Sequence, residues 1–578
     1  MQEFRVWAPR ASVVELALGG RRLPMRRDDD GAWRVIADAQ HGEAYAFVVD
    51  GDELPDPRSA AQPDGVHAHS RVVDHRAFDW HDEDFRAPPL AGAILYELHV
   101  GTFSREGTFD GAIAHLDDLR ALGASHVELM PVAAFDGSHG WGYDGVAPFA
   151  PYAPYGGPDG LKRFVDACHA RGLGVVLDVV YNHLGPSGNY LARFGPYFTD
   201  RYRTPWGDAV NLDGPGSDEV RRFVIDNAVS WVRDYHVDAL RLDAVHAIFD
   251  FSATHVLEEL ARAVHAAGAT LGKHVAVIAE SDLNDPRLLY APAAGGYGLD
   301  AQWSDDVHPA LHAMLTGERH GYYEDFGPLA EVARSLERGW CYDGRFSPHR
   351  GRRHGRPASG LDGTRFVAFL QNHDQIGNRA RGERLAQIAG LARAKIGAAL
   401  LLTSPFVPLL FQGEEWAASA PFQYFTAHGD ERLAEAVREG RKREFAAFAW
   451  QGEVPDPQAP ETLERSRLDW SERGREPHAG MLRWYRDLIR LRRTTADLAD
   501  PRLERTRVAW SDEARWLVVH RGDVAVACSL AAEPQPVPVA GVGRTVLLAS
   551  DGNATVVGDA VGLPPDAVVV LSAATEPS

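Results

Sequence analysis

Residues 218–246, DEVRRFVIDNAVSWVRDYHVDALRLDAVH, contain the pattern of an amphipathic helix followed by that of a buried strand. The helix begins with Asp218 and Glu219, and acidic residues are favourable at the positive end of a helix. Its apolar residues recur every three or four positions: Val220, Phe223, Val224, Ala228, Trp231, Val232 and Tyr235. The following segment, DALRLD (238–243), is expected to be a strand, and it ends at Asp243. This order predicts a parallel sheet that is covered by helices.

The same order of elements recurs on both sides of this stretch. Short apolar segments alternate with helical patterns, and those segments are AILYELHV (93–100), HVELM (126–130), GVVLDVV (174–180), HVAVIAE (274–280), TRFVAFLQ (364–371) and LLLTSPFVPLLF (400–411). Repeated strand–helix units of this kind predict an α/β fold with a central (β/α)8 TIM barrel and long loops.

The segments before and after the barrel contain short strands separated by turns. Residues 1–88 include FRVWAP and YAFVVDG, with turn formers such as Gly19-Gly20 between strands. Residues 501–578 include VAVACSL and AVVVLS. We therefore expect three domains: an N-terminal β-sandwich at 1–88, the barrel at 89–500, and a C-terminal β-sandwich at 501–578.

The chain is acidic, with 60 Lys and Arg against 81 Asp and Glu, for a formal charge of −21. Such a surface repels phosphate backbones and anionic lipids, so we expect no nucleic-acid partner and no membrane partner. A neutral sugar would not be repelled. Three cysteines do not make a disulfide framework. We expect a cytoplasmic protein, because the sequence has neither a signal-peptide pattern nor an apolar run long enough to span a bilayer.

Polar residues follow four of the predicted barrel strands, at the end where the loops of such a barrel converge. They are Asp178, Asn182 and His183 after the third strand, Arg241, Asp243 and His246 at the fourth, Glu280 at the fifth, and His373, Asp374 and Asn378 at the seventh. One such residue alone is usually structural, but polar groups at four strand ends indicate a shared site.

Two carboxylates of this set fit the chemistry of glycoside hydrolysis. Arg241 and Asp243 are two residues apart on a strand, so they face the same way, and the guanidinium favours an ionised, nucleophilic carboxylate. Glu280 ends an apolar strand, where we expect burial to favour the neutral, proton-donating form. Retaining glycoside hydrolysis uses such a pair, and Asp374 would stabilise the transition state through sugar hydroxyls. His183 and His373 are expected to be neutral hydrogen-bond donors.

The four segments resemble those of the α-amylase family of glycoside hydrolases, in order and in spacing. The resemblance implies that Asp243 is the nucleophile, Glu280 the acid/base and Asp374 the transition-state stabiliser. It also implies that Tyr143, in GWGYDGV (140–146), stacks against the reacting sugar. The substrate-binding residues expected from it are Tyr143, His183, Arg241, His246, His373, Gln375 and Asn378, together with Asp305, Asp306 and His308 in WSDDVHPALH (303–312), which resembles a substrate-contacting loop.

A closer resemblance is to the branch of that family that acts on maltooligosyltrehalose. It rests on residues 153–191, TPWGDAVNLDG (204–214), AESDLNDPR (279–287) and GEEWAASAPFQYFTAH (413–428). It implies hydrolysis of the α-1,4 bond next to the terminal trehalose, with maltooligosyltrehalose and other α-glucan oligosaccharides as ligands. A glucan branching enzyme and an isoamylase-type debranching enzyme are the alternatives. A non-catalytic glucan-binding protein is disfavoured, because all three acidic residues are present.

No metal and no cofactor is expected. In α-amylases the residue that matches Asn182 helps to hold calcium together with a long insertion, but here the segment after His183 is short and lacks an oxygen-rich cluster. The basic run SPHRGRRHGRP (347–357) is interrupted by Gly and Pro, and it is expected to be a solvated loop.

Overall fold

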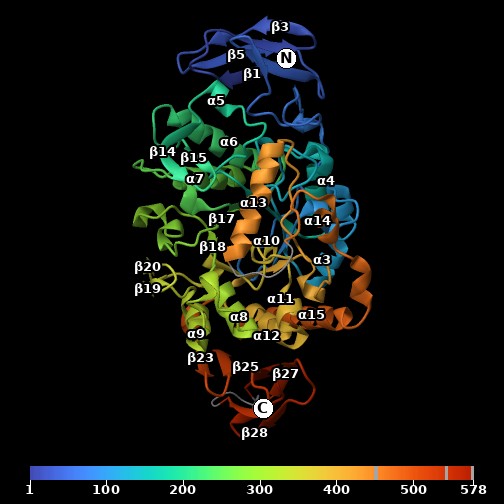
Figure 1. Cartoon of the computed structure of the whole chain (residues 1–578), viewed down its shortest axis with the longest axis vertical. Helices are drawn as coiled ribbons and strands as arrows, with labels where there is room; N and C mark the ends of the chain where they lie inside the picture. The colour runs from blue at the N-terminus through green and yellow to red at the C-terminus, as the bar shows by residue number, and fades with distance from the viewer. Residues whose placement is uncertain (448–453, 540–544, 574–578) are drawn as a thin grey trace.

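The computed structural model describes residues 1–447, 454–539 and 545–573, and Figure 1 shows the order of their elements. Eight parallel strands close into a barrel, which confirms the predicted (β/α)8 fold. In barrel order the strands are β9 (Leu95–Leu98), β10 (His126–Leu129), β13 (Gly174–Val179), β16 (Ala239–Leu242), β17 (Ala276–Ala279), β18 (Ala301–Trp303), β21 (Phe366–Phe369) and β22 (Val407–Phe411).

Helices between the strands cover the outside of the barrel. The main ones are α4 (Gly157–His169), α6 (Ser217–Asp234), α7 (Val256–Thr270), α8 (Val307–Thr316), α9 (Leu329–Arg338), α12 (Leu391–Leu402) and α15 (His478–Thr494). The helix predicted from residue 218 is α6, and its apolar stripe is buried from Val220 to Trp231. The strand predicted next to it is β16, so the periodicity of this stretch predicted both elements.

The barrel elements differ from the expectations in three places. The apolar run 400–411 was expected to be one strand, but its first three residues end helix α12 and only Val407–Phe411 form β22. A short apolar run does not distinguish a buried helix from a buried strand. The sixth strand, β18, is only three residues long and was not recognised. Residues 303–312 were expected to be a loop, but they comprise the end of β18 and the first part of α8.

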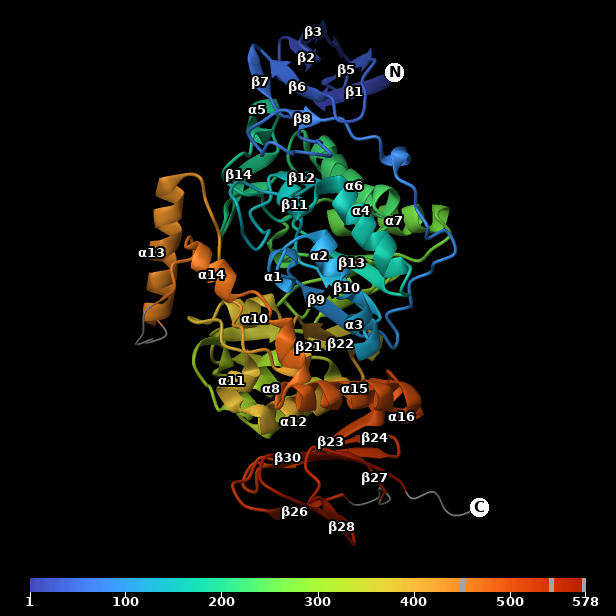
Figure 2. The same ribbon diagram turned by 90° about the vertical axis from the view of Figure 1, so that its right-hand side faces the viewer.

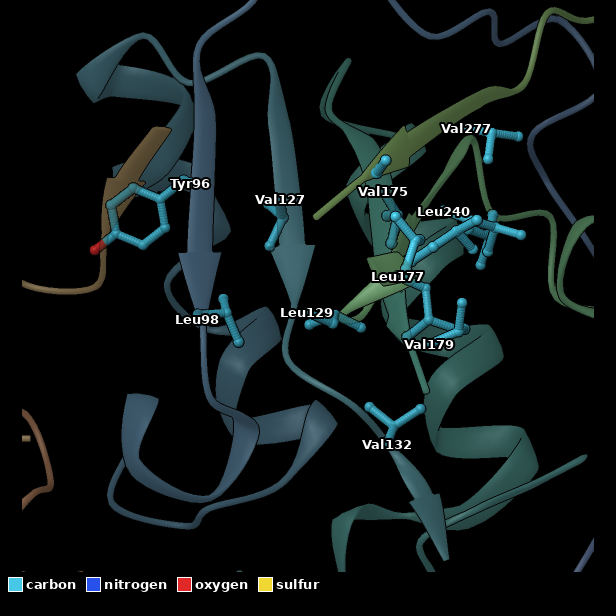
Figure 3. Packing of buried hydrophobic residues seen from close by; sticks show 14 of the residues in the cluster. Tyr96, Leu98, Val127, Leu129, Val132, Val175, Leu177, Val179, Leu240 and Val277 are labelled. Atoms are coloured by element: carbon cyan, nitrogen blue, oxygen red, sulfur yellow. The ribbon is translucent and has the colours of Figure 1, made fainter. Parts of the chain in front are cut away.

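The barrel strands bury both faces. On β13, Val175, Leu177 and Val179 point outward into the layer between strands and helices, as Figure 3 shows. Val176, between them, belongs to the separate cluster that fills the barrel interior. Successive side chains of a strand alternate between faces, so Asp178 also points inward, beyond Val176. The interior thus changes from apolar to polar toward the carboxyl ends of the strands.

Strand-rich regions flank the barrel at opposite ends of the molecule, as Figure 1 and Figure 2 show. The N-terminal one has two sheets, built around β1 (Gln2–Trp7) with β5 (Ala32–Ala37), and around β2 (Val14–Leu18) with β6 (Ala44–Val49). The C-terminal one has a five-stranded and a three-stranded sheet that share an apolar cluster. No helix in the described parts of the chain combines the length and apolar content that a bilayer crossing requires.

The segment that leads from the N-terminal sheets into the barrel is fixed at the amino ends of the strands. Its Trp80 ring stacks on His236, with ring centroids 3.8 Å apart. The Asp82 carboxylate lies 2.6 Å from His169 Nδ1 and 2.9 Å from His236 Nδ1. His169 Nε2 in turn lies 2.8 Å from Asp238 Oδ2. These contacts form a buried cluster of alternating acids and imidazoles on the face opposite the predicted site.

Candidate active site

A single buried guanidinium lies at the centre of the carboxyl ends of the strands. Arg241 Nη1 donates to both Asp178 oxygens at 2.8 and 2.7 Å and to Asp243 Oδ1 at 2.9 Å. Its Nη2 lies 3.1 Å from Glu280 Oε2, and the guanidinium carbon Cζ lies 4.3 Å from the centroid of the Trp303 ring. Burial opposes the charge, but these carboxylates raise the pKa of Arg241 well above its usual value. The residue therefore stays cationic and holds three acids together.

We expected a charged partner beside Asp243 and an apolar environment around Glu280, but both acids have polar partners in the structure. Glu280 was expected in an apolar environment, but its Oε2 contacts Arg241 and accepts a 2.6 Å hydrogen bond from the backbone N–H of Ala244. The prediction failed because the neighbouring strand supplies polar partners, which the apolar sequence before Glu280 does not indicate. The two acids differ in position instead: Glu280 lines a cavity, whereas Asp243 is buried beside Asn182.

Asn182 holds the second oxygen of Asp243. Its Nδ2 donates to Asp243 Oδ2 at 2.8 Å, and its Oδ1 lies 2.6 Å from His183 Nδ1. His183 Nε2 lies 3.0 Å from the Tyr143 carbonyl oxygen, and the ring stacks on Trp206 at 4.4 Å. Burial lowers the pKa of His183 to about 4, so the ring is neutral at pH 7, as expected. Trp206 was not singled out from the sequence, where it is one aromatic residue within TPWGDAV (204–210).

A second polar chain runs from Tyr143 to the first barrel strand. The Tyr143 hydroxyl donates to Asp178 Oδ2 at 2.7 Å and lies 2.8 Å from His373 Nε2. His373 Nδ1 lies 2.5 Å from Glu97 Oε1, and its backbone N–H donates to Glu97 Oε2 at 3.1 Å. Burial opposes protonation of His373, but the Glu97 carboxylate outweighs it and raises the pKa of His373 to about 9.

His373 was expected to be neutral, and that prediction is wrong. The protonated ring can donate from both nitrogens, to Glu97 and to the Tyr143 oxygen. Glu97 was missed in the sequence, where its one signal is a charged residue inside the apolar segment 93–100. Asp178 is buried as well, and its burial, opposed by Arg241, raises the pKa of that carboxyl to about 7.

A cavity of about 570 Å³ opens beside this network. The residues that line it include Glu280, Asp305, Tyr322, Asp374, Gln375 and Asn378. Asp374 Oδ1 accepts a 3.2 Å hydrogen bond from Asn378 Nδ2 and lies 3.6 Å from His373 Nε2. Gln375 Oε1 accepts a 2.5 Å bond from the Tyr322 hydroxyl. Burial raises the pKa of Asp305 well above its usual value, and this carboxyl faces the same space.

Of the ten expected substrate contacts, Asp305, Gln375 and Asn378 line this cavity. Tyr143, His183, Arg241 and His373 belong to the network beside it, and the remaining three lie outside both. Asp306 Oδ2 accepts bonds from the backbone N–H groups of Cys341 at 2.6 Å and Tyr342 at 2.9 Å, which is a structural role. His308 is buried in α8, with Nδ1 2.6 Å from the carbonyl oxygen of Leu370. His246 is exposed in the turn after β16. The expected loop is partly helical here, and this turns Asp306 and His308 away from the site.

The basic run 347–357 was expected to be a solvated loop; most of its side chains are exposed, but it forms part of a hairpin. Strands β19 (Asp343–Ser347) and β20 (Arg352–Gly355) pair, and between them Arg350 lies 3.0 Å from Asp282, two residues after Glu280. The structure gives Asn182 a partner other than a metal, namely Asp243. Within the described ranges, no three His, Cys, Asp or Glu side chains are grouped so that they could hold a metal ion.

Comparison with known proteins finds relatives among the glycoside hydrolases, which agrees with the paired acids of this site. The family "Alpha amylase, catalytic domain" matches residues 60–203, and a domain of unknown function matches residues 501–570. The malto-oligosyltrehalose trehalohydrolase of Arthrobacter ramosus is 51% identical over 99% of this chain and 100% of its own length. Those of Mycobacterium tuberculosis and Saccharolobus solfataricus are 51% and 44% identical, over 94% and 85% of each chain.

Similarity to other enzymes is weaker or shorter. The 1,4-alpha-glucan branching enzyme of Pseudoalteromonas atlantica is 35% identical over only 42% of this chain and 37% of its own. A crystal structure from Salmonella typhimurium superposes with a TM-score of 0.91 at 38% identity, covering 99% of this chain and 97% of that one. A pullulanase of Anoxybacillus shares the fold, with a TM-score of 0.73 at 19% identity over 99% of this chain and 86% of its own.

Proposed function

The chain belongs to the malto-oligosyltrehalose trehalohydrolases of the α-amylase family, and we propose that it hydrolyses the α-1,4-glucosidic bond next to the terminal trehalose of maltooligosyltrehalose. The products are free trehalose and a maltooligosaccharide shortened by two glucose units. The observation that carries the proposal is the pair Asp243 and Glu280, bound to the same buried Arg241 beside a cavity of about 570 Å³. Pockets that bind small-molecule ligands commonly have volumes of about 300–1,000 Å³.

The first step assigned to the pair is formation of a glycosyl ester. Asp243 attacks the anomeric carbon, and Glu280 gives its proton to the glycosidic oxygen that leaves with trehalose. The bonds from Arg241 at 2.9 Å and Asn182 at 2.8 Å support this role of Asp243, because both favour its ionised form and fix its two oxygens. Glu280 lines the cavity, where a leaving oxygen can reach it.

The second step returns the enzyme to its starting state. Glu280, now ionised, takes a proton from water, the water oxygen attacks the anomeric carbon, and the bond to Asp243 breaks. The two displacements retain the anomeric configuration. Carboxyl groups of retaining enzymes lie roughly 5–5.5 Å apart, and contact of both acids with one guanidinium favours this short spacing over that of inverting enzymes.

We assign the remaining residues of the site to substrate binding. Asp374, which is 41% exposed at the cavity, would accept hydrogen bonds from hydroxyls of the reacting sugar as its ring flattens. Tyr143, which shares Asp178 with Arg241, lies 2.8 Å from His373 Nε2, and both residues would support the same ring. Gln375, Asn378 and Asp305 provide donors and acceptors for trehalose, which is neutral and rich in hydroxyls.

Domain roles and location are part of the same proposal. We assign residues 89–500 to catalysis, and residues 1–88 and 501–578 to the two flanking domains. Cys168, Cys341 and Cys528 are free and buried, so no disulfide supports the fold. This supports a reducing compartment, and we place the protein in the cytoplasm.

Product analysis tests the proposed reaction. The purified chain is incubated with maltooligosyltrehalose, with a plain maltooligosaccharide and with glycogen, and the sugars are separated by chromatography. Trehalose is the expected first product, and D243N is the matched control without a nucleophile. New α-1,6 branches would assign the chain to the branching enzymes, and cleavage of α-1,6 bonds to the debranching enzymes.

A further inference from the structure

Helix α13 (Glu431–Ala447) follows the last barrel strand and stands apart from the helices that cover the barrel, as Figure 2 shows. Among its described side chains, those of residues 431–443, only Ala434 is buried. The described part of the helix buries little apolar surface and gains little from packing, so its polar contacts contribute to where it lies.

One of those polar contacts reaches the wall of the catalytic cavity. Arg441 Nη1 donates to Asn378 Oδ1 at 3.1 Å, and its Nη2 donates to the Gly377 carbonyl oxygen at 3.0 Å. Its guanidinium also lies 4.8 Å from the centroid of the Tyr424 ring. These contacts join α13 to the end of α10 (His373–Gly377), the helix that carries Asp374.

Asn378 lies one helical turn after Asp374, on the same side of α10. Its Nδ2 donates to Asp374 Oδ1 at 3.2 Å, and both residues line the cavity. The amide therefore has a cationic donor on its oxygen and a carboxylate acceptor on its nitrogen.

We propose that Arg441 is a positioning residue for the reaction, because it fixes the orientation of the Asn378 amide toward Asp374. A guanidinium can only donate, so it accepts only the oxygen side of the amide as its partner. The NH2 group must then face Asp374. Without Arg441 the amide can rotate by half a turn and place its oxygen against the carboxylate, which repels it.

The inference rests on the proposed role of Asp374 and is tested by a double-mutant cycle on maltooligosyltrehalose. R441Q and N378A are each expected to lower kcat/KM roughly tenfold, mainly through kcat, which is the effect of losing one hydrogen bond to a charged group. The kcat/KM of the double variant is also expected to be roughly tenfold below that of the wild type, since both changes remove the same contact with Asp374. R441K keeps a donor-only side chain and should recover to within about threefold of wild type.

Arg438 provides the matched control on the same helix. It pairs with Asp456 at 3.0 Å, so R438Q removes an α13 ion pair without touching α10, and it should stay within about twofold of wild type. Losses that multiply to roughly a hundredfold in the double variant would overturn the inference. An R441K variant as slow as R441Q would also overturn it, as would an R438Q variant whose kcat/KM falls as far as that of R441Q. Circular dichroism checks the fold of each variant. Failure of the wild type to release trehalose would refute the proposed function instead, because the cycle can be run on any glucan that the wild type cleaves.

Discussion

Replacing Asn182 by alanine should slow the reaction without unfolding the chain. Asn182 is almost fully buried, and its Nδ2 donates to Asp243 Oδ2 at 2.8 Å. Arg241 keeps its 2.9 Å bond to the other oxygen, so the nucleophile stays in place but loses one of two fixed contacts. A hydrogen bond to a charged group contributes about 1.5–3 kcal/mol. At about 1.4 kcal/mol per tenfold in rate, N182A should lower kcat/KM by about 10- to 150-fold.

The assay is trehalose release from maltooligosyltrehalose, with kcat and KM determined separately. Y181F is the matched control: the Tyr181 hydroxyl donates to Asn227 at 2.7 Å, on the outer side of the barrel. It should lower the thermal stability but leave kcat within about twofold, because it removes a buried bond that does not reach the site. An N182A enzyme within threefold of wild type, or a Y181F enzyme as slow as N182A, would refute the role given to Asn182. Rescue of N182A by added calcium would point to a metal site instead.

Three further changes probe the acids and the opposite face of the barrel. D243N should retain less than about a tenth of the wild-type rate, since a neutral amide forms no glycosyl ester; greater activity would exclude Asp243 as nucleophile. E280Q should recover on an activated aryl glycoside, whose leaving group needs no proton, and equal damage on both substrates would leave Glu280 only a binding role. The carboxylates of Asp238 and Asp82 outweigh the effect of burial and raise the pKa of His169. The contacts of protonated His169 with these acids therefore stabilise the folded state fully below about pH 6.5, and this contribution is lost as the pH rises through the higher folded-state pKa. D82N should therefore lower the free energy of unfolding by about 3 kcal/mol at pH 6 and by less at pH 9, in melts at both pH values; a loss that is larger at pH 9 would contradict this.

The repeating strand–helix pattern was enough to predict the barrel and the four strand ends that carry the polar residues. Apolar residues at a period of 3.6 predicted α6, and the two-residue spacing of Arg241 and Asp243 predicted that they share a face, which the 2.9 Å bond confirms. The shortest strand, β18, escaped because three residues carry no period, and the run 400–411 misled because a buried helix and a buried strand are equally apolar.

The rest of the site depends on contacts between distant segments. Glu97 lies far from His373 in sequence, yet their 2.5 Å contact decides the charge of that ring. Glu280 ends an apolar strand, but the Ala244 N–H and Arg241, from the neighbouring strand and its loop, determine its surroundings. Arg441 reaches α10 from a helix after the last strand. Such partners follow from three-dimensional packing, which the local pattern around each residue does not contain.

Substrate preference tests the central claim most directly. Trehalose joins two glucose units through both anomeric carbons, so a site shaped for it leaves polar groups unpaired when a linear maltose unit takes its place. Each unpaired buried group costs about 1–3 kcal/mol, and two groups at about 1.4 kcal/mol each already predict a preference of about a hundredfold. The measurement is the ratio of kcat/KM for maltooligosyltrehalose to that for a maltooligosaccharide of equal length. A ratio of about a hundred or more, with trehalose as first product, is the predicted result, and equal values for the two substrates would contradict it and leave a general amylase.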